Sequence, residues 1–230
     1  MVESMGIRIG LSLVAAYFLG SLPSAAWIAK LCYGVDITQV GSRNPGMTNV
    51  LRTLGWKPAV PVILIDAGKG YFSAWLALIL TGSLAWALAA GLLAVLGHSF
   101  TVFASFKGGK GVLTGFGVFL YFTPISALAG LAAWIAVVAK TRYVSLGSIT
   151  AAVVMPTGIF VESRLRGDQT LLPILAVATV VCGFVLFRHR ANISRLMNGT
   201  ENKFGRAVPA GGPGTHGSHG SLGSKRSDIR

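Results

Sequence analysis

The sequence predicts an all-α protein that crosses a membrane several times, and three observations lead to this fold class. Of the 230 residues, 53% are hydrophobic and only 12% are charged, whereas an ordinary soluble domain has about 25% charged residues. The mean hydropathy is +0.66. Apolar stretches recur along the whole chain, and a helix needs about 20 such residues to cross a hydrocarbon core roughly 30 Å thick. A polytopic membrane protein is therefore expected.

The apolar stretches define the expected transmembrane elements in order. They lie at residues 9–29, 58–80, 84–104, 111–139, 144–162 and 170–187. The first is longer than the roughly 7 to 15 residues of a signal-peptide core, so we expect it to be retained. The fourth is longer than one crossing requires, and Pro124 lies near its middle. A turn at Thr123–Pro124 would give two short helices and about seven transmembrane helices in total.

The distribution of charge predicts the orientation of the chain. The net charge is +13, and the segment from Arg188 onward has far more basic than acidic residues. With seven crossings, the basic loops all fall on the side of the carboxyl terminus, which the positive-inside rule places in the cytoplasm. The amino terminus is then outside. Nucleic-acid binding is the other common use of such charge, but the membrane rule is simpler, and no nucleic-acid partner is expected.

Composition also predicts a domain boundary. We expect residues 1–206 to form the transmembrane domain and residues 207–230, rich in Gly, Ser and Pro, to form a disordered basic tail. His216 and His219 in this tail have no third ligand nearby in sequence, so a metal site is not predicted. Cys32 and Cys182 are expected to be packing residues rather than disulfide partners.

Four polar segments on the predicted inner side hold the candidate site residues. They are GVDITQVGSRNPGMTNVLR at 34–52, GHSFTVFASFKGGKGVLTG at 97–115, KTRYVSLGSI at 140–149 and FRHRANISRLMNGTENK at 187–203. Hydroxyl, amide and guanidinium donors in the first segment suit phosphate oxygens. These donors are Ser42, Asn44, Thr48, Asn49 and Arg52. A plain turn followed by a helix cap is the alternative for this segment.

The second segment combines several glycines, which have no side chain to cover the backbone, with positive charge. Gly108, Gly109 and Gly111 would let backbone N–H groups approach an anion, and a helix starting near Gly111 would point its positive end at the same place. Lys107 and Lys110 add full charges, although both could simply be positive-inside anchors. A Walker loop is not present, since Gly rather than Ser or Thr follows Lys110. A nucleotide triphosphatase is therefore disfavoured.

The third and fourth segments add further donors. Ser145 could bind an anion or cap the next helix, and the sequence leaves this open. His189 and Asn192 lie three residues apart, which places them on one face of a short helix. The polar segments hold neither paired carboxylates nor a set of metal ligands. They predict a site that stabilises negative charge without a metal or other cofactor.

Asp66 and Lys69 stand apart from these segments. They lie three residues from each other inside an apolar stretch, where ionisable side chains are costly and are either functional or paired. We expect them to pair with each other and to be structural.

Six motifs, taken in order, resemble one known family. They are GSLPSA at 20–25, GSRNPGMTNVLR at 41–52, DAGKG at 66–70, GHSFTVFASFKGGKGVLT at 97–114, SLGS at 145–148 and HRANISRLMNGTE at 189–201. In these motifs the chain is similar to the bacterial acyl-phosphate:glycerol-3-phosphate acyltransferases. The resemblance covers roughly residues 20–203 and implies a seven-helix enzyme of the bacterial inner membrane with its active site on the cytoplasmic face.

The resemblance also implies an activity, in which a fatty acyl group passes from acyl phosphate to the 1-hydroxyl of glycerol 3-phosphate. The products are lysophosphatidic acid and phosphate, and the reaction is the first acylation step of phospholipid biosynthesis. The implied partners are the two substrates, the lipid bilayer and the enzyme that supplies acyl phosphate.

The resemblance assigns roles to particular residues. The implied catalytic residues are Ser42, Lys107, His189 and Asn192. The implied substrate-binding residues are Arg52, Gly108, Gly109, Gly111 and Ser145, and Glu201 is implied to be structural. To these substrate-binding candidates the polar segments themselves add Arg43, Asn44, Asn49 and Lys110. Thr38 and Arg43 depart from the usual pattern of the family, which leaves open whether Arg43 or Arg52 contacts which phosphate.

A second hypothesis is a membrane transporter of an organic phosphate. It would need polar residues along several helices at mid-depth, and apart from Asp66 and Lys69 such residues are scarce. A structural scaffold, the third class, would leave the polar segments unexplained. For an acyltransferase, we expect a donor phosphate oxygen to take the hydroxyl proton while His189 and Asn192 position the acceptor.

Overall fold

The computed structural model describes residues 2–205, and within them six helical segments are long and apolar enough to cross a membrane. Five are single helices: α1 (Val2–Ser21), α4 (Trp56–Thr81), α7 (Pro124–Thr141), α8 (Val144–Arg166) and α9 (Leu171–Arg188). The sixth is α5 (Leu84–Ser99) with the 3-10 turn η1 (Val102–Ala104) that follows it. A shorter apolar helix is α6 (Val112–Phe122). The predicted tail, with His216 and His219, lies outside the described residues.

The predicted break in the fourth apolar stretch is confirmed. Helix α6 ends at Phe122 and α7 begins at Pro124, with Thr123 between them in a non-helical conformation. Proline is well tolerated at the first position of a helix because the N–H group that it lacks would have no partner there. The all-helical membrane fold with about seven apolar helices is therefore as expected.

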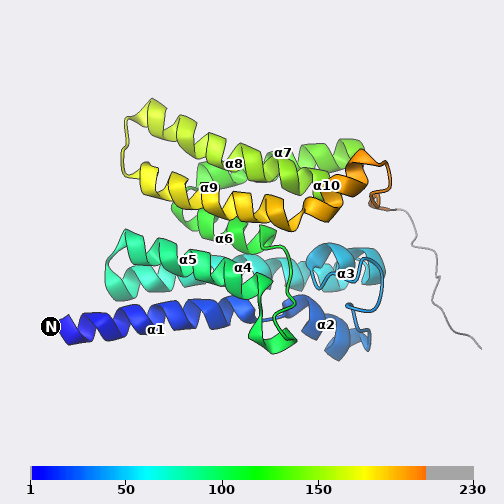
Figure 1. Cartoon of the computed structure of the whole chain (residues 1–230), viewed down its shortest axis with the longest axis horizontal. Helices are drawn as coiled ribbons and strands as arrows, with labels where there is room; N and C mark the ends of the chain where they lie inside the picture. Colours follow the sequence, from blue (N-terminus) through cyan, green and yellow to red (C-terminus); the bar gives the residue numbers. More distant parts are fainter. Residues whose placement is uncertain (1, 206–230) are drawn as a thin grey trace, which may run out of the picture.

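The helices form two groups joined by α6 (Figure 1). Helices α1, α4 and α5 pack together, and so do α7, α8 and α9. Helix α6 lies against α4, and their backbones come very close. A Cβ atom on Gly117 would lie only 1.9 Å from the carbonyl oxygen of Ala67, and one on Gly70 would lie 2.1 Å from that of Thr114. Such small residues allow helices to pack closely where lipid gives no hydrophobic driving force.

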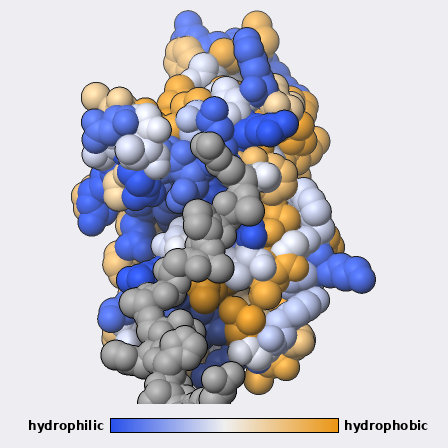
Figure 2. Space-filling view, turned by 90° about the vertical axis from the view of Figure 1, so that its right-hand side faces the viewer, coloured by the Kyte–Doolittle hydropathy of each residue, from blue (hydrophilic) through white to orange (hydrophobic). Residues whose placement is uncertain are grey.

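The polar segments meet at one end of the bundle. The short helices α2 (Ser24–Tyr33), α3 (Met47–Leu54) and α10 (Arg190–Met197) lie at that end, whereas the amino terminus and the α4–α5 and α8–α9 turns lie at the other (Figure 1). Figure 2 looks onto the first end, where hydrophilic residues gather. This arrangement brings residues 34–52, 106–111, 140–149 and 187–203 together.

Candidate active site

A cavity of about 500 Å³ lies among α3, α4 and α6 to α10. Its lining changes character along its length. Polar residues of the lining are Ser42, Asn44, Thr48, Asn49, Arg52, Asp66, His98, Lys110, Ser145, Ser148, Arg188, His189, Asn192, Arg195, Glu201 and Asn202, and most of them belong to the loop end. Apolar and small residues from the helices are Val112, Leu113, Phe116, Ala127, Gly130, Leu131, Trp134, Ala152, Met155 and Val181. The cavity therefore joins a charged compartment to an apolar one, and we call these the polar end and the apolar arm.

The apolar arm extends into the part of the bundle that crosses the membrane. Along α8 the lining runs from Ser145 in the first turn to Met155, and ten residues of α-helix rise about 15 Å. Helices α4 and α7 both line the cavity, yet they are not among the pairs that pack closely in the described bundle. The arm can thus hold an extended hydrocarbon chain that begins beside the polar end.

Glu201 organises the polar end. Its Oε1 atom accepts hydrogen bonds from Ser145 Oγ at 2.9 Å and Asn192 Nδ2 at 2.8 Å, and Arg195 Nε donates to its Oε2 at 2.7 Å. Burial acts to raise the pKa of Glu201, but these hydrogen bonds outweigh it and the pKa is lowered. Glu201 is thus an anion that ties α8 to α10.

Lys110 reaches into this cluster from the glycine-rich loop. Its Nζ atom donates a short hydrogen bond to Asn192 Oδ1, so the asparagine links the lysine to Glu201. Burial lowers the pKa of Lys110 to about 8, although the negative charge of Glu201 opposes the shift. The ammonium group is still mainly protonated at pH 7. Of the two loop lysines, Lys107 and Lys110, Lys110 is the one that lines the cavity.

His189 lies at the junction of α9 and α10, and its ring is held by the end of α9. The side chain is buried, and its Nδ1 atom lies 2.8 Å from the carbonyl oxygen of Val185. Because a carbonyl oxygen only accepts, Nδ1 carries the proton and Nε2 keeps a lone pair. Burial, reinforced by the charge of Lys110, lowers the pKa of His189 to about 4. The ring is neutral at pH 7 and can accept a hydrogen bond from a hydroxyl group.

Helix α3 supplies a guanidinium group and supports the first loop. Arg52 Nη2 donates to the carbonyl oxygen of Asn202 at 3.0 Å, and its buried Nε has no partner among the described residues. The side chain of Asn49, by contrast, is hydrogen-bonded to the backbone of the first loop. Its Oδ1 accepts from Ser42 N at 2.9 Å, and its Nδ2 donates to the carbonyl oxygens of Ile37 and Val40. Its geometry supports positioning of Ser42 rather than direct contact with substrate.

The glycine-rich loop differs from the predicted anion cradle. The N–H groups of Gly108 and Gly109 already donate to the carbonyl oxygens of Ser99 and His98, both at 3.1 Å, so in this arrangement neither is open to an anion. Gly111 does line the cavity, where it precedes α6 with φ +80°. The first backbone N–H groups of α6 have no partner inside the helix, and the positive end of the helix dipole points toward the polar end of the cavity.

Four of the residues predicted to be catalytic or to bind substrate lie outside the cavity: Arg43, Lys107, Gly108 and Gly109. Lys107 is exposed and lines a separate, water-sized hollow of about 10 Å³, together with Gly108, Gly109 and His98. Arg43 is exposed with φ +57° and does not line the cavity either. Asn44 does line it, so the first loop still contributes beside Ser42.

The sequence interpretation missed two arginines. Arg195 lines the cavity and pairs with Glu201. Its position three residues after Asn192, on the same helical face, was a signal that could have found it. Arg188 also lines the cavity, and its Nη2 donates to the carbonyl oxygens of Gly108 and Gly109 at 3.2 and 3.0 Å.

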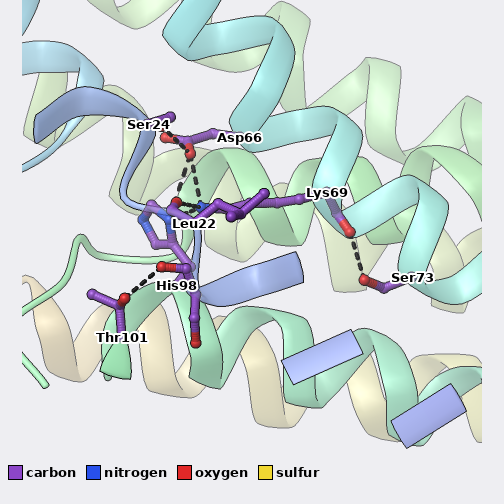
Figure 3. A network of polar contacts seen from close by, with 8 residues as sticks. Leu22, Ser24, Asp66, Lys69, Ser73, His98 and Thr101 are labelled. Atoms are coloured by element: carbon purple, nitrogen blue, oxygen red, sulfur yellow. Dashed lines mark hydrogen bonds and ion pairs between the residues drawn. The ribbon is translucent and has the colours of Figure 1, made fainter. Parts of the chain in front are cut away.

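The predicted pairing of Asp66 with Lys69 is present, with Nζ and Oδ1 2.9 Å apart and both side chains 2% exposed. His98 completes the cluster, because its Nδ1 lies 2.7 Å from Lys69 Nζ (Figure 3).

Comparison with known proteins gives a consistent result. The sequence profile of the glycerol-3-phosphate acyltransferase family matches residues 10–199. Glycerol-3-phosphate acyltransferase of Fusobacterium nucleatum is 44% identical over 192 residues, which are 84% of this chain and 96% of that protein. The protein of the same name from Geobacter sulfurreducens is 46% identical over 189 residues, which are 82% of this chain and 94% of that protein.

Solved structures agree with the sequence matches. Crystal structures of PlsY (YgiH), an integral membrane glycerol 3-phosphate acyltransferase, are similar in their glycerol 3-phosphate and lysophosphatidic acid forms, with TM-scores of 0.79 and 0.76. Both are 40% identical in sequence, and both alignments cover 86% of this chain, with 96% and 95% of the PlsY chain. The chain described here therefore belongs to the family of integral membrane glycerol-3-phosphate acyltransferases.

Proposed function

We propose that the protein transfers a fatty acyl group from acyl phosphate to the 1-hydroxyl of glycerol 3-phosphate, giving lysophosphatidic acid and phosphate. The observation that carries this proposal is the single cavity in which a cationic polar end continues into an apolar arm. The two substrates together require both: two phosphate groups need cations and hydrogen-bond donors, and one long chain needs an apolar space.

The polar end has the charge that two phosphates need. Four basic side chains, Arg52, Lys110, Arg188 and Arg195, line the cavity. Its lining carboxylates are Glu201 and Asp66, and Asp66 is paired with Lys69. We place the phosphate of the acyl donor beside Lys110 and the first turn of α6, since the apolar arm starts there. Glycerol 3-phosphate then lies toward Ser42, Arg52, His189 and Asn192.

The chemistry needs orientation more than activation. In the proposed step the 1-hydroxyl oxygen bonds to the acyl carbonyl carbon, the bond from that carbon to the phosphate oxygen breaks, and the hydroxyl proton passes to the departing phosphate. Before the reaction, the neutral Nε2 of His189 accepts the hydrogen bond of the hydroxyl and directs its oxygen at the carbonyl. As the new C–O bond forms, that proton leaves its hydrogen bond to Nε2 and moves to an oxygen of the donor phosphate. A ring whose pKa is about 4 is a weaker base than a phosphate monoester, whose second pKa is about 6. The phosphate is therefore the better final proton acceptor, and no protein nucleophile is required.

The setting of the reaction follows from the arrangement of the loops. All four polar segments lie at one end of the bundle (Figure 1), and their basic residues assign that end to the cytoplasm of a bacterial cell by the positive-inside rule. Acyl phosphate is a reactive mixed anhydride, so the enzyme that makes it is a natural partner at this face.

The decisive test uses purified protein with a long-chain acyl phosphate and glycerol 3-phosphate. The proposal predicts equal amounts of phosphate and lysophosphatidic acid, with no product when acyl-CoA replaces acyl phosphate. A His189→Gln variant should fold and lose most turnover, because the amide cannot reproduce the geometry of the ring acceptor. Release of no phosphate, together with flux of glycerol 3-phosphate into sealed vesicles, would instead support the transporter hypothesis.

A further inference from the structure

Asp66, Lys69 and His98 form a buried polar network at the edge of the active site, which the proposed reaction does not use (Figure 3). Asp66 and His98 line the cavity, and Lys69 lies behind them. Asp66 and Lys69 come from α4, and His98 comes from the end of α5. All three lie in helices that cross the membrane, where charged side chains are costly. A buried ion pair contributes little net stability to a fold, because apolar residues of similar volume often stabilise it equally well. Its presence here calls for another reason.

The bonds of Lys69 fix the ring of His98. The three protons of its ammonium group meet three acceptors: Asp66 Oδ1 at 2.9 Å, the carbonyl oxygen of Leu22 at 3.1 Å and His98 Nδ1 at 2.7 Å. Ser24 Oγ donates a hydrogen bond of 2.7 Å to the same Oδ1 atom of Asp66. An ammonium group only donates, so Nδ1 of His98 is the acceptor and the ring has one defined orientation.

The fixed ring supports the glycine-rich loop. The carbonyl oxygen of His98 accepts the N–H of Gly109 at 3.1 Å. A Cβ atom on Gly109 would lie 2.2 Å from His98 Nε2, and one on Gly108 would lie 2.0 Å from the His98 carbonyl oxygen. The backbone of the loop therefore rests directly on His98, and only glycine fits at either position.

The loop is held from its other side as well. Arg188 donates to the carbonyl oxygens of Gly108 and Gly109, so these two residues are clamped between α5 and α9. The next residue is Lys110, which bonds Asn192 at the polar end of the cavity. A shift of Gly109 would be passed on directly to the Lys110 ammonium group and to the start of α6.

We infer that Asp66, Lys69 and His98 are positioning residues for catalysis, which set the place of Lys110 by fixing the loop of residues 107–111. The inference rests on the proposed function, because it assigns the network to the binding of the acyl phosphate. It gives the buried ion pair a role beyond the stability of the fold.

The test replaces the pair with apolar residues of similar size, Asp66→Leu with Lys69→Met. We expect this variant to keep its melting temperature in detergent, yet to lose about 10- to 100-fold in kcat/KM for acyl phosphate, the scale expected for a displaced reacting group. KM for glycerol 3-phosphate should stay near its wild-type value, a split that a general loss of structure would not give. The matched control is Glu162→Leu with Arg166→Met, which removes the ion pair at the far end of α8 and should leave both constants unchanged.

A second variant, His98→Phe, removes the acceptor for Lys69 while it keeps an aromatic ring and leaves Asp66 and Lys69 paired. We again expect kcat/KM for acyl phosphate to fall while KM for glycerol 3-phosphate stays near its wild-type value. The inference would be overturned if either variant, Asp66→Leu with Lys69→Met or His98→Phe, folded and kept kcat/KM within about threefold of wild type. Failure of both variants to fold would also overturn it, because the network would then be a requirement of folding. An inactive wild-type protein in the same assay would refute the proposed function instead.

Discussion

At the scale of single residues, the structure distinguishes two lysines that the sequence presents as equivalent. Lys107 and Lys110 flank the same glycine pair, but Lys107 is exposed while Lys110 lines the cavity and bonds Asn192. A residue-by-residue reading cannot separate them, because the direction of each side chain depends on the turn between them and on the clamp from α5 and α9. The geometry therefore favours Lys110 for the catalytic role that the resemblance assigns to Lys107.

This difference predicts unequal effects of mutation. Lys110→Ala should lower kcat/KM for acyl phosphate by about 10- to 100-fold, since a hydrogen bond to a charged group contributes about 1.5 to 3 kcal/mol. Lys107→Ala should cost less than about tenfold, because an exposed charge is screened by solvent. Steady-state kinetics of the two purified variants, each checked for folding, measure the contrast. Equal losses, or a larger loss for Lys107→Ala, would contradict the assignment.

The pKa values of two site residues predict a pH profile. His189 has a pKa of about 4 and Lys110 of about 8. Between these values the ring is neutral and the ammonium is protonated, so neither group should change kcat/KM between about pH 5 and 7. It should fall above about pH 8 as Lys110 loses its proton, since kcat/KM reports groups of the free enzyme.

The control for the pH profile is Lys110→Arg. A guanidinium group stays charged at every accessible pH, so the fall above pH 8 should disappear from whatever activity this variant retains. Persistence of the same fall in Lys110→Arg would show that another group titrates, and the assignment to Lys110 would be wrong.

At the scale of elements, much of the fold was predictable and the reasons are physical. The lengths of the apolar stretches and the charges that flank them predicted the membrane helices, and Pro124 predicted the break between α6 and α7. These predictions were possible because each signal is local in sequence. The short helices at the loop end depend on contacts between distant segments. The bond from Arg52 to Asn202 joins residues 150 positions apart, and no local pattern indicates it. For the same reason the sequence could not show that the N–H groups of Gly108 and Gly109 are already bonded.

The apolar arm between α6, α7, α8 and α9 predicts that chain length can be altered at Gly130. This glycine of α7 lines the cavity, and a Cβ atom there would lie 3.5 Å from Met155 Cβ, an ordinary contact distance. Gly130→Leu should therefore fold, helped by the better helix propensity of leucine, while its side chain fills the arm. KM should rise about tenfold or more for a 16-carbon acyl phosphate, as expected when a buried apolar group must be displaced, and change little for an 8-carbon one.

The matched control for this variant is Gly183→Leu. Gly183 is an exposed glycine of α9 with open space around its Cβ position, so the change should leave chain-length preference unaltered. If Gly130→Leu and wild type preferred the same chain lengths, the acyl chain would have to lie elsewhere.

At the scale of the whole molecule, the loops define one functional end, and the positive-inside rule predicts which compartment it faces. Exposed positions at the two ends, Gln169 between α8 and α9 and Ser194 on α10, allow a direct test. In a protein with Cys32 and Cys182 replaced by alanine, Gln169→Cys should react with an impermeant maleimide on intact cells. Ser194→Cys should react only after the cells are opened. The reverse pattern would place the site outside and contradict the predicted orientation.

The central claim is that one cavity holds both phosphorylated substrates next to each other. The most direct measurement is a crystal structure with glycerol 3-phosphate and an acyl phosphonate, an analogue that cannot transfer its acyl group. The account predicts that the analogue's chain occupies the apolar arm and its phosphonate lies beside Lys110. It also predicts that the 1-hydroxyl oxygen lies about 3 to 3.5 Å from the carbonyl carbon, the separation of a near-attack arrangement. Binding of either molecule outside the cavity, or at opposite ends of the bundle, would contradict it.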